Sequence, residues 1–233
     1  MSKLSYIARR IGACAGIFAC LTYSTLTLSS LVKYYIKRKE AYERFSKMDY
    51  KTAIKDVKTP EDARLYTSFF IKPADDYKNY KSYDYFAPFE EIHKRKKDDC
   101  DGGAIAACAL LYDDGYEPLF LAMYRKNKNI GHAIYVYKRD GKWGSIGINK
   151  SDWNEPKFDS VKELVASFGY DEYTLYDLDK IGHDWINGNE NLKPYIIDNS
   201  KCIVEEGEIK NNRFLAWIRF FIITPLKEIS PFY

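Results

Sequence analysis

Cys100 is the residue of this sequence whose position most favours covalent chemistry. It follows Asp98 and Asp99 and begins a run of small and apolar residues, which predicts a buried helix over residues 101–112. At a helix N-terminus the free backbone N–H groups and the helix dipole favour the thiolate, which is the nucleophilic form of cysteine. The same N–H groups can donate to an oxyanion during acyl transfer. Cys100 is therefore a candidate nucleophile.

A cysteine nucleophile needs a base, and His132 is the candidate. The acids that flank Cys100 oppose thiolate formation because like charges repel, and a neighbouring histidine activates a thiol as a base or as an ion-pair partner. Two other histidines compete with His132. We expect His93, in a charged run, to lie on the solvated surface, and His183 lies in a turn-like region without a companion motif.

The elements that must position these residues form a sheet. A first strand is predicted over residues 119–124, and Gly131-His132 opens a second over residues 133–138. Asp140-Gly141 is typical of a two-residue hairpin turn, and the return strand is predicted over residues 143–148. A helix followed by successive neighbouring strands indicates an α+β domain with an antiparallel sheet.

The hairpin register nominates a third member of the site. A two-residue turn at Asp140-Gly141 pairs Tyr137 with Gly144 and, farther along, His132 with Asn149. Directly opposite residues point to the same face of a sheet, so Asn149 could orient the imidazole as in Cys-His-Asn sites. A one-residue bulge would break this register, and Asp152 is then the alternative.

The same residues resemble the transglutaminase-like superfamily. Asp99-Cys100-Asp101-Gly102-Gly103-Ala104 is similar to its Gly-Asp-Cys-Asp-Asp-x-Ala signature, and Gly131-His132-Ala133 followed by Gly141-Lys142-Trp143 is similar to its histidine strand and return strand. The resemblance covers about residues 86–158 and keeps the family order of Cys, His, then Asp or Asn. It implies a papain-like fold and acyl transfer at peptide or isopeptide amides through a thioester, by a peptidase, amidase or transglutaminase.

Three departures from the family pattern support an alternative function. Asp98 replaces the glycine before the Asp-Cys pair, and Gly102 replaces the second acid after the cysteine. Gly147 stands where the family has an orienting acid, so either Asn149 substitutes for it or the third member is missing. The alternative is a catalytically degenerate domain that serves as a structural or interaction subunit of a membrane or larger assembly.

The N-terminal region predicts a membrane helix. Residues 11–32 carry no charge and are long enough to cross a bilayer, for which about 20 residues are needed. A cleaved signal peptide and a buried helix are the competing interpretations, because serines and threonines dilute the run. Basic residues are more frequent after it than before it, which places the main domain on the cytoplasmic side. Gly12 and Gly16 would permit two such helices to associate.

The predicted organisation has three parts. Residues 1–55 form the membrane helix with a charged extension, residues 56–200 form the transglutaminase-like domain, and residues 201–233 form a strand and an apolar interfacial or docking helix. Thr59-Pro60 is a helix-start signal, and the polar stretch over residues 73–83 is predicted to be a surface loop.

Composition excludes several classes of function. Basic and acidic residues nearly cancel, with a net charge of +3, which does not favour nucleic-acid binding. No paired spacing of cysteine or histidine predicts a disulfide framework or a metal site, and no cofactor motif is present. We expect Cys108 to be a small buried hydrophobic residue. The five cysteines are Cys14, Cys20, Cys100, Cys108 and Cys202.

Overall fold

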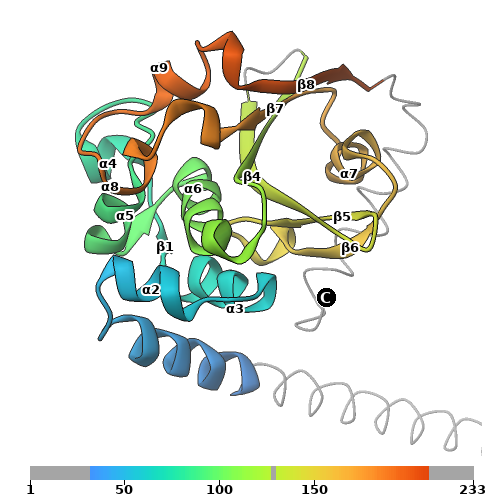
Figure 1. The fold of residues 1–233 in the computed structure, drawn as a ribbon. Helices are drawn as coiled ribbons and strands as arrows, with labels where there is room; N and C mark the ends of the chain where they lie inside the picture. Colours follow the sequence, from blue (N-terminus) through green and yellow to red (C-terminus); the bar gives the residue numbers. More distant parts are fainter. Residues whose placement is uncertain (1–31, 127–129, 210–233) are drawn as a thin grey trace, which may run out of the picture.

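The computed structural model describes residues 32–126 and 130–209 and has a six-stranded sheet at its centre (Figure 1). Each strand pairs antiparallel with its neighbour, in the order β6-β5-β4-β3-β7-β8. This confirms the predicted α+β class with an antiparallel sheet. The strands are β3 Leu119–Arg125, β4 Ile130–Arg139, β5 Lys142–Ile146, β6 Asn154–Phe158, β7 Glu172–Asp177 and β8 Ile203–Glu208.

The hairpin between β4 and β5 forms as the sequence predicts. Asp140 and Gly141 both adopt positive φ, 53° and 77°, as a two-residue turn of this kind requires. The register pairs Tyr137 with Gly144. Strand β5 ends at Ile146, however, two residues earlier than expected. The chain beyond Ile146 therefore leaves the ladder before it can reach the start of β4.

Helix α6, Cys100–Leu111, packs against one face of the sheet, and each of its residues after Cys100 is buried. It confirms the predicted buried helix, and Cys108 within it is fully buried as expected. Its small residues let the surrounding elements approach closely. Figure 1 shows α6 between the sheet and the helices of the N-terminal half. These helices are α2 Tyr50–Asp56, α3 Pro60–Leu65 and α5 Phe89–Arg95.

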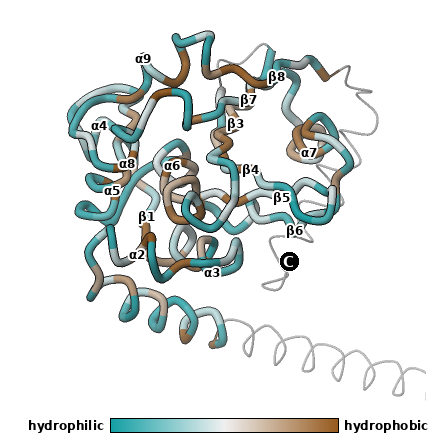
Figure 2. Tube along the Cα trace, in the orientation of Figure 1, coloured by the Kyte–Doolittle hydropathy of each residue, from teal (hydrophilic) through white to brown (hydrophobic). Residues whose placement is uncertain are grey.

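The other face of the sheet is covered by α7, Val161–Phe168. Successive side chains of a strand point to opposite faces. On β3, Phe120 and Ala122 belong to the core around α6, whereas Leu121 and Met123 belong to the smaller core under α7. The sheet is therefore buried on both faces, and Figure 2 shows hydrophobic residues on the strands and on α7.

The N-terminal segment contributes to the main core. A helix covers residues 32–45, and the turn after it ends at Asp49, whose side chain caps α2 by accepting from the Thr52 N–H. Phe45 and Ala53, which the sequence assigned to the charged extension, are fully buried in the core around α6. Within the described ranges no helix is long and apolar enough to cross a membrane. The predicted span lies outside the described residues, apart from Val32.

The stretch over residues 73–83, predicted as a loop, contains helix α4, Asp76–Tyr80. Asp75 caps it, and Asp76 and Asn79 are buried despite their polarity. The prediction was wrong because it equated polar composition with exposure, whereas the Asp76 carboxylate accepts from the Tyr85 N–H at 2.5 Å inside the fold.

The remaining short elements connect the larger ones. Thr59 caps α3 with Pro60 at its first position, which confirms the predicted helix start. Strand β8 is the predicted C-terminal strand; the apolar stretch over residues 214–226 lies outside the described residues. The other short elements are β1 Lys72–Pro73, β2 Lys97–Asp98, α8 Asp184–Asn187 and α9 Lys193–Ile196.

Candidate active site

Cys100 is the first residue of α6 and is partly buried. Asp99 is the N-cap and accepts from the Asp101 N–H at 3.1 Å. The backbone N–H of Ala133 donates to the Cys100 sulfur, which places the thiol beside the start of β4. Gly103, one turn along α6, lets the helix approach the segment after β5, because a Cβ there would lie 2.8 Å from the Cβ of Ile148. The thiol is thus adjacent to the residue that follows His132.

His132 is held by a buried carboxylate. Its Nε2 lies 3.0 Å from Oδ1 of Asp152, and the two side chains are 14% and 4% exposed. The second Asp152 oxygen accepts from the backbone N–H of Asn149 at 2.9 Å, and Ser145 Oγ donates to the Asp152 carbonyl at 2.7 Å. Both carboxylate oxygens are therefore engaged, and Nδ1 is the histidine nitrogen that is not bonded to Asp152.

The structure brings Asp152, the alternative, to His132 and leaves the side chain of Asn149 out. Asn149 is exposed; its backbone N–H donates to the Asp152 carboxylate at 2.9 Å, and its carbonyl accepts from the Asp152 N–H at 3.1 Å. The predicted register holds where β4 and β5 pair, but β5 ends before it reaches His132. A 3₁₀ turn at Lys150–Asp152 then returns the carboxylate to the histidine. The end of the strand, and not a bulge within it, selects Asp152.

Gly147 stands where the family resemblance implies an orienting acid, and its lack of a side chain leaves space for the carboxylate of Asp152. A Cβ at this position would lie 2.5 Å from Oδ2 of Asp152, closer than any real contact. Its carbonyl accepts from Thr67 Oγ1 at 3.0 Å, in a buried hydrogen bond that fixes the segment. The missing side chain is thus the space that the Asp152 carboxylate occupies.

Tyr170 completes the surroundings of His132. The two rings are stacked, with centroids 6.2 Å apart and planes at 18°, and the Arg125 guanidinium lies 5.3 Å from the centre of the tyrosine ring. Burial raises the pKa of Tyr170, and the neighbouring Arg125 guanidinium lowers it in part. No feature of the sequence distinguishes Tyr170 among the 21 tyrosines, so only the structure identifies it.

The electrostatics at Cys100 oppose the thiolate. Burial raises its pKa well above the usual range, and the charges of Asp99, Asp101 and Asp152 raise it further; the Ala133 N–H lowers it. The position of Cys100 at the helix start therefore does not offset the effect of the neighbouring acids on its pKa. The sequence predicted that these acids oppose thiolate formation. The resting thiol is protonated at neutral pH, and a reaction needs a base to remove that proton.

A second group of acids lies around the start of α6. One oxygen each of Asp76, Asp98 and Asp99 lie within 4.8 Å of one another, and so do one oxygen each of Asp76, Asp84 and Asp101. Burial, with repulsion among the acids, raises the pKa of Asp76 to about 7 and of Asp98 to about 8, and it also raises the pKa of Asp99 and Asp101. The sequence analysis did not predict this cluster, because Asp76 lies in the stretch predicted to be a surface loop and Asp84 directly follows that stretch.

The two other histidines do not join the site. His93 is buried, contrary to prediction, with Nδ1 2.8 Å from the Tyr66 hydroxyl and Nε2 2.8 Å from the Met48 carbonyl. The charged run around it belongs to α5, whose inner face packs on the core, so Lys94 and Arg95 are exposed while His93 is buried. His183 is exposed and touches only the edge of Tyr112 among the ring contacts of the described residues.

Comparison with protein families and curated proteins finds no relative. No protein-family model matches the sequence, and no curated protein matches it significantly. The chemistry of the site must therefore be inferred from the arrangement of Cys100, His132 and Asp152.

Proposed function

We propose that this protein is a cysteine acyl-transfer enzyme with a papain-like, transglutaminase-like domain, acting on peptide or isopeptide amides. Cys100 is the nucleophile, His132 the base and Asp152 the orienting acid. The observation that carries the proposal is the buried bond from His132 Nε2 to Asp152, next in sequence to Ala133, whose backbone N–H donates to the Cys100 thiol. A cysteine beside a histidine that a carboxylate orients is the arrangement of an activated nucleophile.

Each group has a role in the acyl transfer. His132 Nδ1 takes the thiol proton as the sulfur attacks the amide carbonyl carbon, and Asp152 stabilises the imidazolium that forms. Free N–H groups at the start of α6 can donate to the resulting oxyanion. The imidazolium then protonates the leaving amine as the C–N bond breaks, leaving a thioester on Cys100. Water or a second amine attacks the thioester and releases the acyl group.

The resting pKa of Cys100 decides between two forms of this mechanism. Because burial and neighbouring acids keep the thiol neutral, a preformed thiolate–imidazolium pair is not the starting state. His132 must act as a general base in the attack itself. The same observation favours the second candidate, a degenerate domain that serves as a structural or interaction subunit, in which Cys100 has no reactivity of its own.

The remainder of the proposal concerns location. The uncharged run over residues 11–32 would tether the enzyme to a membrane as a single span, with the main domain on the cytoplasmic side and protein or peptide substrates there. Association through that helix, with another copy or another protein, is part of the same proposal.

Acylation by p-nitrophenyl acetate tests the proposal. We expect a burst of p-nitrophenolate close to one equivalent per chain, with the acetyl group mapped to Cys100 by mass spectrometry and then released by water. Cys100→Ser and His132→Ala should lose the burst, and Cys108 and Cys202 are internal controls for ordinary thiols. Acetylation of Cys100 at the same rate with and without His132 would contradict the enzyme and favour the structural subunit.

A further inference from the structure

We infer that Arg38, Arg64 and Lys150 form a binding site for a phosphate group, supplied by an anionic lipid headgroup or by a soluble phosphate ester. The three residues come from three elements: the helix over residues 32–45 (the N-terminal helix), α3, and the 3₁₀ turn that ends at Asp152. The site stands on the geometry of these elements. Only the expectation that a lipid supplies the phosphate rests on the proposed function, through its membrane span.

Aromatic rings bring the three cationic groups to one place. The Lys150 ammonium lies 3.2 Å from the centre of the Tyr34 ring on the N-terminal helix. Arg38 follows Tyr34 by one helical turn, and residues four apart lie on the same face of a helix. The Arg64 guanidinium lies 5.1 Å from the centre of the Trp153 ring, directly after the turn that Lys150 begins. The three side chains therefore converge where the N-terminal helix meets this turn.

The N-terminal helix is fixed in this position by contacts on both sides of Arg38. Before it, the Tyr34 ring packs edge-on against Phe69, with ring centroids 5.2 Å apart. After it, an Arg44 guanidinium nitrogen donates to the carboxylate of Asp62 in α3 at 2.9 Å. Figure 1 shows the helix, in blue, beside α3. The fold therefore holds an arginine of this helix next to Lys150.

None of the three cations has an acidic partner in the part of the chain that the structure describes. The ion pairs among these residues do not include Arg38, Arg64 or Lys150. Nε of Arg64 is buried and has no hydrogen-bond acceptor there. The acids that act on its charge do not pair with it, since Glu61 bonds another arginine and Glu155 is exposed. Buried donors are almost always satisfied in proteins, so this N–H is available to an anionic acceptor.

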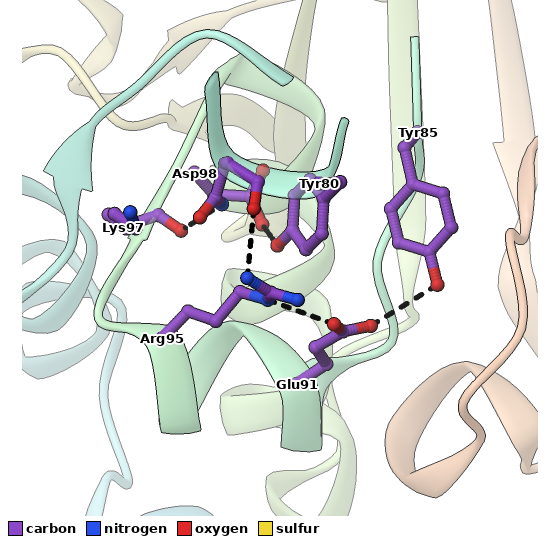
Figure 3. Close-up of polar contacts among 7 residues, drawn as sticks. Tyr80, Tyr85, Glu91, Arg95, Lys97 and Asp98 are labelled. Atoms are coloured by element: carbon purple, nitrogen blue, oxygen red, sulfur yellow. Dashed lines mark hydrogen bonds and ion pairs between the residues drawn. The ribbon is translucent and has the colours of Figure 1, made fainter. Parts of the chain in front are cut away.

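Arg95 shows how the fold satisfies an arginine that needs no ligand. Its guanidinium also lies over an aromatic ring, 4.6 Å from the centre of Tyr80. Its Nε donates to Glu91 at 2.9 Å, as Figure 3 shows, and its Nη1 donates to the Asn79 carbonyl at 2.8 Å. Arg64 has the same aromatic platform without the carboxylate. A guanidinium stacked on a ring keeps its N–H edge for a planar or tetrahedral anion, as in phosphate recognition.

The three cations also act on one another. Burial lowers the pKa of Lys150, and the positive charges of Arg64 and Arg38 lower it further. Like charges without counter-ions repel, and a bound anion would remove this repulsion. A phosphate monoester carries a charge of about −2 and three acceptor oxygens. A carboxylate has only two oxygens in one plane and is satisfied by one guanidinium, so three cations from three elements suit phosphate better.

The place of the site in the chain favours a lipid as the source of the phosphate. The N-terminal helix follows the uncharged run over residues 11–32, for which we propose a membrane span. It carries further basic residues, among them Lys33, Lys37 and Lys39. Basic residues directly after a membrane helix attract anionic lipid headgroups. We therefore expect the phosphate of an anionic lipid to reach Arg38 first and then the two more buried cations.

The test measures phosphate binding by the full chain in micelles of a neutral detergent. Dihexanoyl phosphatidic acid, dihexanoyl phosphatidylcholine and inorganic phosphate are titrated separately by calorimetry. We expect one phosphatidic acid to bind per chain, inorganic phosphate to bind more weakly, and the zwitterionic lipid not to bind. Equal affinities for phosphatidic acid and inorganic phosphate would support the site with a soluble ester as its ligand.

Substitutions locate the binding. Lys150→Gln and Arg64→Gln should each weaken phosphatidic acid binding about tenfold or more, because each removes a charge-assisted hydrogen bond. The matched control is Lys51→Gln, which removes an exposed ammonium that likewise lies over a tyrosine ring, 5.7 Å from the centre of Tyr50. It should leave the affinity unchanged. If Arg64→Gln fails to fold, Lys150→Gln and the exposed Arg38→Gln decide.

Each outcome bears on one proposal. The titrations are repeated with Cys100→Ser, so that binding is measured without acylation. Binding without any burst in the wild-type protein would overturn only the proposed function, and a burst without binding would overturn only the site. A folded chain that binds neither phosphatidic acid nor inorganic phosphate contradicts the inference. So does a loss of affinity in Lys51→Gln as large as in Lys150→Gln, or equal binding of the zwitterionic lipid.

Discussion

Two sets of carboxylates lie beside Cys100, and they are satisfied in different ways. Asp152 has a partner for each of its oxygens, His132 for one and the Asn149 N–H for the other. In the second set, Asp76 and Asp101 each have a buried oxygen without any described partner, and burial raises their pKa. The first set is complete as the chain folds, whereas the second needs a proton.

This difference in hydrogen bonding suggests how to distinguish the carboxylate that takes part in the reaction from those that do not. A carboxylate that is fixed by the fold can orient a histidine in every molecule, so its removal should affect the reaction under all conditions. The predictions below start from the largest expected effect.

Asp152→Ala should produce the largest loss after the loss of Cys100 or His132 themselves. Without the carboxylate the imidazole loses its orientation and the stabilisation of its charged form, so the acylation rate should fall by about 10²–10⁴-fold. Asn149→Ala, which keeps the backbone N–H, is the matched control and should change the rate less than about 3-fold. Burst kinetics with p-nitrophenyl acetate measure both. Equal losses in the two variants would break the assignment of Asp152.

Gly147→Ala should disturb the same side by steric means. The new Cβ would displace the Asp152 carboxylate, so we expect an acylation rate about 10–100-fold lower and a free energy of unfolding reduced by about 1–3 kcal/mol. Gly131→Ala is a suitable control, because its Cβ would meet the Tyr124 ring at an ordinary 3.5 Å. Chemical denaturation and burst kinetics check the two effects; an unperturbed Gly147→Ala enzyme would show that the glycine has no role.

The sequence predicted the local parts of this site and missed the parts that depend on tertiary packing. Cys100 at a helix start and the hairpin turn at Asp140-Gly141 follow from local signals, since capping and positive φ are properties of a few neighbouring residues. Asn149 was preferred over Asp152 because the register was extended past Ile146, where β5 ends. Strand ends depend on what the chain packs against and carry weaker local signals.

The acidic cluster and His93 were missed for another reason. Both lie in stretches whose composition is polar, and polar composition predicts exposure on average. In the structure each polar group is buried together with a partner or with other polar groups, as for His93 between Tyr66 and Met48. Such burial depends on residues far apart in the chain, Asp76 and Asp101 for example, and one sequence does not show which will meet.

Tyr170→Ala should lower the acylation rate moderately, which would separate the contribution of ring stacking from that of the Asp152 carboxylate. The ring stacks on His132 from outside the polar triad, so its loss should leave the His132–Asp152 bond in place and lower the acylation rate by less than about 10-fold, consistent with a stacking contribution of about 0.5–1.5 kcal/mol. Tyr170→Phe keeps the ring and should restore the rate. A loss as large with Phe as with Ala would instead assign a role to the hydroxyl.

The pH dependence of stability should distinguish the second set of acids, with a change of a few degrees in Tm. Asp76 and Asp98 hold protons up to pKa values of about 7 and about 8, against an ordinary value of 3.8. The folded chain therefore binds more protons than the unfolded chain across this range, and the stability present at acidic pH is lost as pH rises towards 8. His93, whose pKa burial lowers, acts in the opposite sense.

The quantity to measure is therefore the Tm difference between wild type and Asp76→Asn. Between pH 5.5 and pH 8.5 the Tm of the variant should rise relative to that of the wild type. A Tm difference that does not change with pH would show that these acids are not protonated in the folded protein. The contrast between them and Asp152 would then be wrong.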